Sequence, residues 1–142
     1  MYGSLEVSTS GMIAQRIRLE VAAANLANKE AILDSSGRVN PYRARHAMFA
    51  PGDPTASTPE GRLMGVHVAQ IEFGKGPPKY KYDPTSPYAI KDGPNAGMVP
   101  VPDVDPITET INSMEAARAY EANVNAAEAT KSMMAQALRL IA

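Results

Sequence analysis

The sequence contains no cysteine and no tryptophan, and it has only two histidines. Without cysteine, a disulfide scaffold and a cysteine-based zinc site are excluded. No apolar run approaches the roughly 20 residues that a bilayer-spanning helix needs. The formal net charge of -1 argues against a dedicated nucleic-acid-binding protein, because such proteins carry a strong basic excess.

Strong core-forming residues are also scarce. Leu, Ile, Val and Phe together make up 26 of the 142 residues, whereas alanine alone accounts for 23. This content is thin for a self-contained globular protein of this length.

Proline and glycine are confined mainly to the middle of the chain. All 12 prolines lie between Pro41 and Pro106, and residues 107–142 contain neither proline nor glycine. Because these two residues are the main helix breakers, the sequence predicts three zones. They are an N-terminal helix zone (1–33), a small β-rich, irregular middle (34–104) and a C-terminal helix zone (105–142). The predicted fold class is therefore mainly α, with the two terminal helices packing as a coiled-coil-like pair.

The N-terminal helix is expected over residues 4–28. Its apolar face is marked by a strict seven-residue repeat and by a neighbouring row that begins at Ile13. Gly11 marks either a close contact or a bend. The repeat consists of Leu5, Met12, Leu19 and Leu26.

The C-terminal helix has a clear start signal. Asp105 is suited to cap the free backbone N–H groups, and Pro106 fits the first helical position. Residues three and four apart then form an apolar row, which shifts around the helix between its two parts. The first part is Ile107, Ile111 and Met114, and the second is Tyr120, Val124, Ala127, Lys131, Met134, Leu138 and Ile141.

The middle zone has weaker signals. Alternation of apolar and polar residues predicts strands at 42–49, 65–73 and 79–82, and residues 51–61 are expected to form a loop. The basic and aromatic stretch 75–82 is the only candidate for polyanion binding. A strand with a solvated lysine face explains it better, so no nucleic-acid partner is expected.

Catalytic and metal-binding signatures are not apparent in the sequence. His46 and His67 lack metal-ligand spacing, and there is no Gly-x-Ser-x-Gly elbow. Glu115, Glu121 and Glu128 are interpreted as part of a solvated helix face and not as catalytic carboxylates; Glu115 and Arg118, three residues apart, are close enough to pair there. We therefore predict no catalytic, metal-binding or cofactor-binding residues, and no enzymatic activity.

The length of the predicted helices points to assembly. At 1.5 Å per residue they extend roughly 37 and 54 Å, which is too long for so small a middle zone to cover. Isolated helices are marginal in water, and burial of their apolar stripes is what stabilises them. We expect the helices to pack against each other and against neighbouring subunits, and to order fully upon association.

The two ends of the sequence resemble the basal-body rod proteins of the bacterial flagellum. Residues 10–28 (SGMIAQRIRLEVAAANLAN) are similar to the N-terminal signature of that family, and residues 114–123 (MEAARAYEAN) are similar to its C-terminal helix. Within the family, the segments PYR (41–43), YDPTSP (82–87), GMV (97–99) and PDVD (102–105) resemble the FlgC type of proximal rod protein.

The resemblance implies a structural role. A rod subunit of this kind would assemble helically with copies of itself and with other rod proteins. The resulting drive shaft would transmit torque, with the terminal helices forming an inner tube around the protein-export channel. The resemblance also implies passage through the flagellar type III export apparatus without a cleaved signal peptide, a periplasmic location, and contacts with the basal-body base and the next rod segment.

The candidate assembly interface combines the apolar rows with the polar residues of the two signatures. From the N-terminal half it includes Leu5, Met12, Ile13, Leu19, Asn25, Leu26 and Asn28. From the C-terminal half it includes Ile107, Ile111, Met114, Arg118, Tyr120, Glu121, Asn123, Val124, Met134, Leu138 and Ile141.

Two alternatives remain open from the sequence. One is a different interaction protein, namely another rod subunit or a needle or adaptor component of a secretion system. The other is a periplasmic wall-modifying hydrolase, which needs two carboxylates at catalytic separation; Asp53 and Glu60 are the residues to test for it.

Overall fold

The computed structural model describes residues 2–141 and shows an elongated molecule built on two long helices. Helix α1 spans Tyr2–Ala27 and helix α3 spans Pro106–Ile141. Between them the chain forms strand β1 (Arg45–Pro51), helix α2 (Pro59–Met64), strand β2 (Val66–Phe73), strand β3 (Lys79–Tyr82) and strand β4 (Met98–Val101). Long terminal helices around a small region of antiparallel strands confirm the predicted mainly α fold class.

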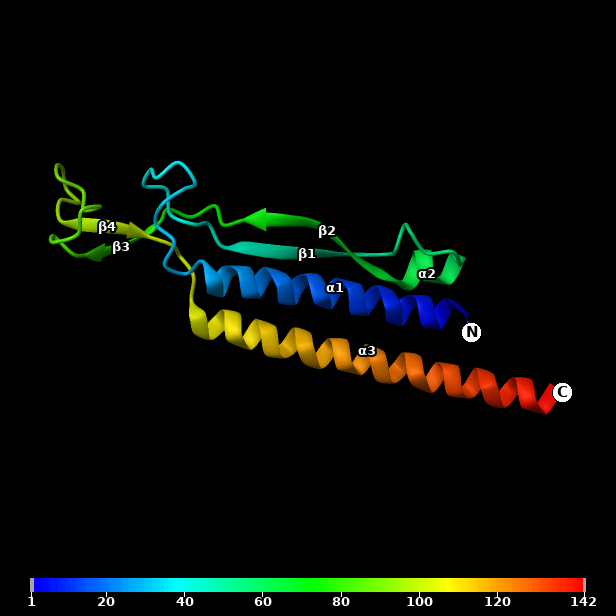
Figure 1. Ribbon diagram of the computed structural model, residues 1–142. Helices are drawn as coiled ribbons and strands as arrows, with labels where there is room; N and C mark the ends of the chain where they lie inside the picture. Colours follow the sequence, from blue (N-terminus) through cyan, green and yellow to red (C-terminus); the bar gives the residue numbers. More distant parts are fainter. Residues whose placement is uncertain (1, 142) are drawn as a thin grey trace.

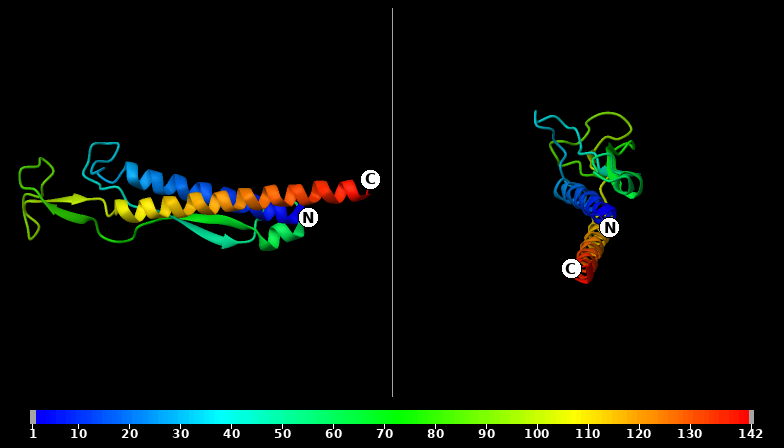
Figure 2. Two further views of the ribbon diagram at one scale, coloured as in Figure 1. Left: turned by 90° about the horizontal axis from the view of Figure 1, so that it is seen from below. Right: turned by 90° about the vertical axis from the view of Figure 1, so that its right-hand side faces the viewer.

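The elements lie in three layers, with α1 in the middle. Figure 1 shows the β1–β2 hairpin along one side of α1, and α3 runs antiparallel to α1 along the other side. The end-on view in Figure 2 confirms the order hairpin, α1, α3. The β3–β4 hairpin projects beyond the helices at one end, and both chain termini lie at the opposite end.

Both terminal helices form close to their predicted positions. α1 begins two residues before, and ends one residue before, the predicted range of 4–28. At the start of α3 the Asp105 carboxylate accepts hydrogen bonds from the backbone N–H groups of Ile107 (3.2 Å) and Thr108 (3.4 Å). The predicted cap at Asp105 is therefore confirmed.

Strands β1 and β2 pair in antiparallel register from Arg45 opposite Phe73 to Pro51 opposite Val66, with a bulge between Met48 and Phe49. The strand predicted at 65–73 is confirmed within one residue. The strand predicted at 42–49 begins three residues later, because the Tyr42 N–H donates to the Ala31 carbonyl (2.9 Å) in the turn after α1.

Two elements of the middle zone were not predicted. Residues 51–61 are not all loop, since α2 begins at Pro59 with Thr58 as its cap, whose hydroxyl accepts a hydrogen bond from the Gly61 N–H (3.1 Å). Strand β4 contains Pro100 and pairs with β3. Of these two strands, only β3 was predicted. A short segment interrupted by proline carries no strand signal of its own.

Across residues 2–141, none of the helices combines the length and the apolar character that a bilayer crossing requires.

Candidate assembly interface

The seam between α1 and α3 is made of small and polar side chains. Ala22 of α1 and Ala116 and Ala127 of α3 are buried. Gly11 lies against Asn123, and a Cβ atom at Gly11 would come within 2.7 Å of the Asn123 side-chain oxygen. Gly11 therefore marks a close contact, and the N-terminal and C-terminal signatures meet at this point.

A polar bridge crosses the same seam. The Arg18 guanidinium donates to the Asn112 side-chain oxygen (3.0 Å) and to the Glu115 carboxylate (2.9 Å). The Glu115 carboxylate is thus bound by Arg18 on the neighbouring helix, and not by Arg118, which lies within reach of it in the sequence. A contact between helices 97 residues apart in the chain is not visible in the sequence of one helix.

Asn25 lies wholly in the interior and connects α1 to β1. Its amide nitrogen donates to the Arg45 carbonyl (2.8 Å), while its oxygen accepts from the Arg45 N–H (2.9 Å) and from the Tyr42 hydroxyl (3.0 Å). With none of its surface exposed, Asn25 has no side-chain surface to offer a neighbouring subunit. Asn28 donates to the Ala24 carbonyl (2.8 Å) and completes the end of α1.

Large apolar side chains lie outside the seam. On α3, Ile107 is 71% exposed, Ile111 51%, Met114 52% and Leu138 67%, and Ile13 on α1 is 47% exposed. Each large apolar side chain left in water loses the free energy that its burial would contribute. The loss is important here because the chain has few other strong core formers to bury. The helix pair therefore presents apolar surface that its own chain does not cover.

The seven-residue repeat of α1 lies on the side of α1 away from the hairpin. Ser10 and Met12 point about 100° to either side of Gly11, and the Ser10 hydroxyl accepts a hydrogen bond from the Val66 N–H of β2 (3.1 Å). Met12 therefore points away from the hairpin, and the other repeat residues share its face. All four side chains are half-buried: Leu5, Met12, Leu19 and Leu26.

The second apolar row of α3 lies on this same side of the helix pair. Val124 follows Asn123 as Met12 follows Gly11, and in an antiparallel pair both steps turn toward the same side. Val124 and Met134 are half-buried, and Tyr120 is 38% exposed. The structure thus brings the two predicted rows together. We call this surface, formed by the α1 repeat and by Tyr120 and Val124, the apolar flank. Met134, in the same predicted row, lies about 20° from the direction of Asn123 and therefore continues the seam face of α3.

The remaining candidate residues fall into other places. Arg118 and Glu121 are exposed on α3, whereas Asn123 lies in the seam and donates to the Ala119 carbonyl (2.7 Å). The side chain of Ile141 lies outside the described part of the chain.

A second docking contact, between α1 and α2, was not predicted. The Glu6 carboxylate accepts hydrogen bonds from the backbone N–H groups of Ser57 (3.1 Å) and Thr58 (2.9 Å) and from the Thr58 hydroxyl. These hydrogen bonds, those of Thr58 first, lower the pKa of Glu6 below its ordinary value of 4.5. The Thr-Pro-Glu sequence at 58–60 was the available signal for the helix cap that receives it.

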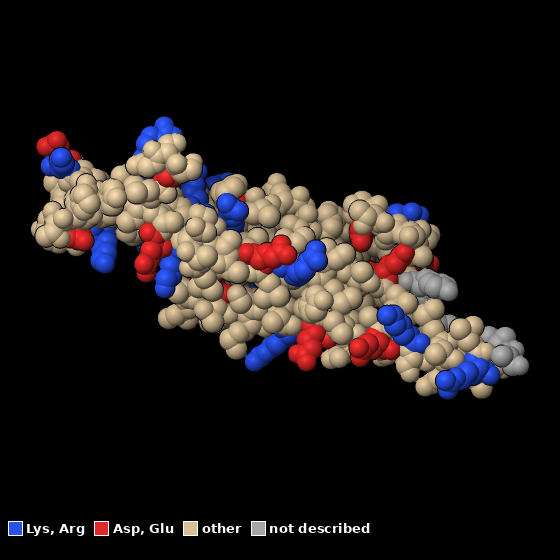
Figure 3. Space-filling model, viewed as in Figure 1, with Lys and Arg blue, Asp and Glu red and all other residues tan. Residues whose placement is uncertain are grey.

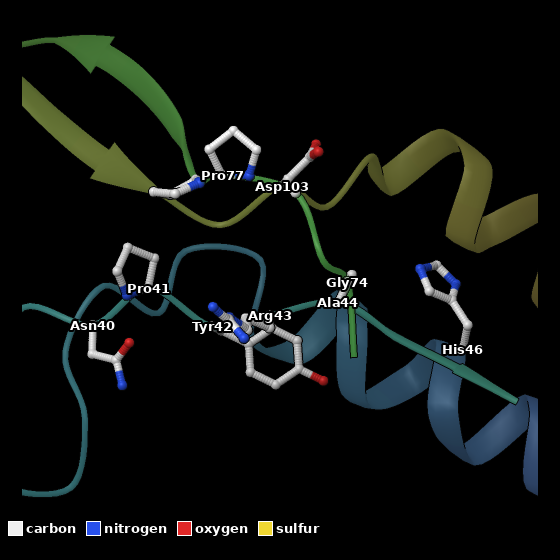
Figure 4. Close-up of a pocket in the computed structure, with 11 residues that line it drawn as sticks. Asn40, Pro41, Tyr42, Arg43, Ala44, His46, Gly74, Pro77 and Asp103 are labelled. Carbon is white, nitrogen blue, oxygen red and sulfur yellow. The ribbon is translucent and has the colours of Figure 1, made fainter. Parts of the chain in front are cut away.

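Two hollows of the surface differ in their acidic groups: one of about 420 Å³ is lined by Glu30 and Asp83 beside Lys29 and Lys81. The other, of about 180 Å³ and shown in Figure 4, lies between the segments joining the two hairpins and includes His46 and a single acid, Asp103. Asp103 forms an ion pair with Lys79 (2.6 Å). Hydrogen bonds from Thr55 lower the pKa of Asp53, so this carboxyl is not poised as a general acid. Within residues 2–141 no group of three His, Asp or Glu side chains is placed to hold a metal ion.

The surface charge is mixed. On the face shown in Figure 3, basic and acidic side chains alternate along the molecule without gathering into one patch. With Lys79 paired to Asp103, the predicted lysine face of β3 is partly neutralised. The arrangement does not resemble a polyanion-binding surface.

These features are those of a structural assembly subunit: two long helices paired along a seam of small residues, with large apolar side chains left exposed. Comparison with known families gives the same class. The model described as "Flagella basal body rod protein" matches residues 5–29, and the model "Flagellar basal body rod FlgEFG protein C-terminal" matches residues 95–140.

Full-length relatives identify the subfamily. The chain is 36% identical over 150 residues to the flagellar basal-body rod protein FlgC of Borreliella burgdorferi, covering 99% of this chain and 97% of the relative. It is 37% identical over 139 residues to FlgC of Salmonella typhimurium and to FlgC of Escherichia coli O6:H1, covering 95% of this chain and 93% of each relative. The chain belongs to the FlgC family of flagellar basal-body rod proteins.

Membership in this family makes the chain a structural subunit of the flagellar basal-body rod, and not an enzyme. Its location is the flagellar basal body, where it assembles with other rod components.

Proposed function

We propose that the subunit assembles helically with copies of itself and with other rod proteins into the drive shaft that transmits torque. In this arrangement residues 1–33 and 105–142 form an inner tube around the protein-export channel, and residues 34–104 lie outside it. The subunit reaches the periplasmic space through the flagellar type III export apparatus, without a cleaved signal peptide. It contacts the basal-body base on one side and the next rod segment on the other.

One observation carries this proposal. The two terminal helices pair through small and polar side chains such as Ala116 and Asn123, and they leave large apolar side chains such as Ile107 and Leu138 exposed. A subunit that folded for itself alone would place the large apolar residues in its seam. A subunit that assembles can bury them against neighbours, over an interface long enough to resist torsion.

We propose that the candidate interface residues have different roles. Asn25, Asn28 and Asn123 hold the chain together internally, and we propose that they position the helices instead of contacting neighbours. The apolar flank together with Ile13, Ile107, Ile111, Met114 and Leu138 is the proposed contact surface. Exposed Arg118 and Glu121 form its polar margin.

The test replaces two apolar positions of α3 with charge. Val124→Asp with Leu138→Asp should abolish incorporation into the rod and motility, because desolvating two carboxylates in an apolar contact is strongly unfavourable. Export of the variant should remain measurable. The matched control is Asn125→Asp with Ser132→Asp, two exposed polar positions of the same helix, which should retain motility. Normal swimming of the Val124→Asp, Leu138→Asp variant would contradict the proposal.

A further inference from the structure

Helix α3 extends beyond its partner at the end that carries both termini. Gly11 lies opposite Asn123, and α1 begins at Tyr2. Because the helices are antiparallel, the first residue of α1 lies opposite a residue of α3 near position 132. About nine residues of α3 remain, a projection of roughly 14 Å, which we call the overhang (residues 133–141). Figures 1 and 2 show it passing the start of α1.

The overhang extends the seam face of α3 beyond the start of α1, so α1 does not cover it there. In the paired part of α3 the residues facing α1 include Ala116 and Asn123, and the same helix face continues to Met134 and Ala137. Apolar side chains are exposed around it: Met133 is 59% exposed, Leu138 67% and Leu140 89%. An apolar helix end of this kind is stabilised when another subunit extends the packing.

A second apolar patch lies at the other end of the same helix. Ile107, Ile111 and Met114 are more than half exposed and span eight residues, roughly 11 Å of helix. Ile107 lies nine residues, or two and a half turns, before the buried Ala116, so it points away from α1. The patch and the overhang are thus of similar length.

The two surfaces are also complementary in charge. Residues 129–141 contain Lys131 and Arg139 and no acidic residue, whereas residues 105–117 contain Asp105, Glu109 and Glu115 and no basic residue. Of the acidic side chains, Glu109 is buried and Glu115 is already paired with Arg18, so Asp105 carries the exposed acidic charge beside the patch. Of the basic ones, Arg139 lies in the overhang itself and Lys131 just before it. Attraction between the basic and the acidic end would favour a head-to-tail orientation over a head-to-head one.

We infer that the overhang of one copy packs on the Ile107–Met114 patch of a second copy of this chain. This inference rests on the proposed assembly function and specifies one of its contacts. Because the two surfaces differ and lie at opposite ends of α3, the contact is heterologous and leaves both ends of a dimer free for further addition. One chain cannot satisfy its own two surfaces, since Ile111 and Leu140 are roughly 43 Å apart along one helix.

The absence of cysteine in the sequence makes disulfide trapping a direct test. The full-length Ile111→Cys, Leu140→Cys chain is oxidised mildly and analysed on a non-reducing gel. A disulfide needs the two Cα atoms within about 7 Å, so an intrachain bond is impossible in the folded chain. The expected result is a ladder of covalent dimers, trimers and longer chains, at least tenfold more abundant than in the control. The control is the Leu140→Cys, Asp92→Cys chain, in which the second cysteine is at an exposed position of the segment that joins β3 to β4.

The single variants determine the geometry of the contact. Neither Leu140→Cys nor Ile111→Cys alone should form a dimer, whereas a mixture of the two should form a heterodimer and nothing longer. Dimers of Leu140→Cys alone would overturn the inference, because they indicate a symmetric contact. No ladder, or an equal ladder in the control, would also overturn it. Rescue of motility in a strain lacking its own rod subunit tests the proposed function separately, so motility without a ladder would refute only this contact.

Discussion

At the scale of single residues, the fully buried Asn25 side chain connects α1 to β1. It is completely buried and satisfies both the N–H and the carbonyl of Arg45, together with the Tyr42 hydroxyl. An asparagine is one of the few side chains able to donate and accept at the same point. Its place in the N-terminal signature therefore has a physical reason, which is attachment of the hairpin to α1.

We expect Asn25→Ala to destabilise the protein by about 3 kcal/mol, because the change leaves buried backbone and hydroxyl groups of Arg45 and Tyr42 without partners. The measurement is the midpoint of urea unfolding at one fixed protein concentration. Asn28→Ala is the matched control. It removes one partly buried hydrogen bond and should cost about 1 kcal/mol or less. Equal effects of the two changes would contradict the role assigned to Asn25.

At the scale of the elements, the contact of Gly11 on α1 with the Asn123 side chain on α3 sets the distance between the two helices. The absence of a side chain at Gly11 lets Asn123 approach, and Asn123 is itself held by its bond to the Ala119 carbonyl. Small residues on both helices, including Ala22 and Ala116, allow the same close approach along the seam. The pair is therefore specified by shape more than by apolar burial.

The change Gly11→Ala tests this view of the seam. Alanine favours a helix over glycine by up to about 1 kcal/mol, but the added methyl would collide with Asn123, and such overpacking costs roughly 1–3 kcal/mol. We expect a net destabilisation of about 1 kcal/mol in urea unfolding. Adding Asn123→Ala should remove the collision, so the double variant should be more stable than the sum of the two single changes predicts. Simple additivity would show that the two side chains do not compete for space.

At the scale of the whole molecule, the structure is long, thin and incompletely covered. The hairpin protects one side of α1, α3 protects another, and the apolar flank and the overhang remain open to contact. Such a shape buries little apolar area per residue, whereas ordering each residue costs conformational entropy. Association is the remaining source of stability.

We expect the dilute, monomeric chain to contain far less helix than the assembled form. The measurement is far-ultraviolet circular dichroism over a range of protein concentrations, with the oligomeric state followed in parallel. The Val124→Asp, Leu138→Asp variant should stay at the low-helix limit at concentrations where the unaltered chain gains helix. Full helicity of the isolated chain at high dilution would refute the assembly-dependent folding that we infer.

The sequence was informative where a signal is local. The cap at Asp105 and the proline-free run after it predicted α3, and the seven-residue repeat at Leu5 and Met12 marked the apolar face of α1. That this face points away from the hairpin follows only from the structure. The sequence did not reveal the partner of Glu115, because Arg18 lies on the other helix. It also missed α2, because a six-residue helix docked by Glu6 depends on a contact from 52 residues away.

Local chemistry, namely backbone propensity, capping and residue periodicity, was thus determined by the sequence alone, and with it the helix–middle–helix plan and the resemblance to a rod subunit. Which faces of the helices meet was decided only by the tertiary structure. The rows of large apolar residues were the obvious candidates for the seam, yet small residues occupy it, since close packing depends on the shapes of both surfaces at once. That choice leaves Ile107, Leu138 and Leu140 exposed, and it explains why a helix pair complete in itself still carries surfaces for other subunits.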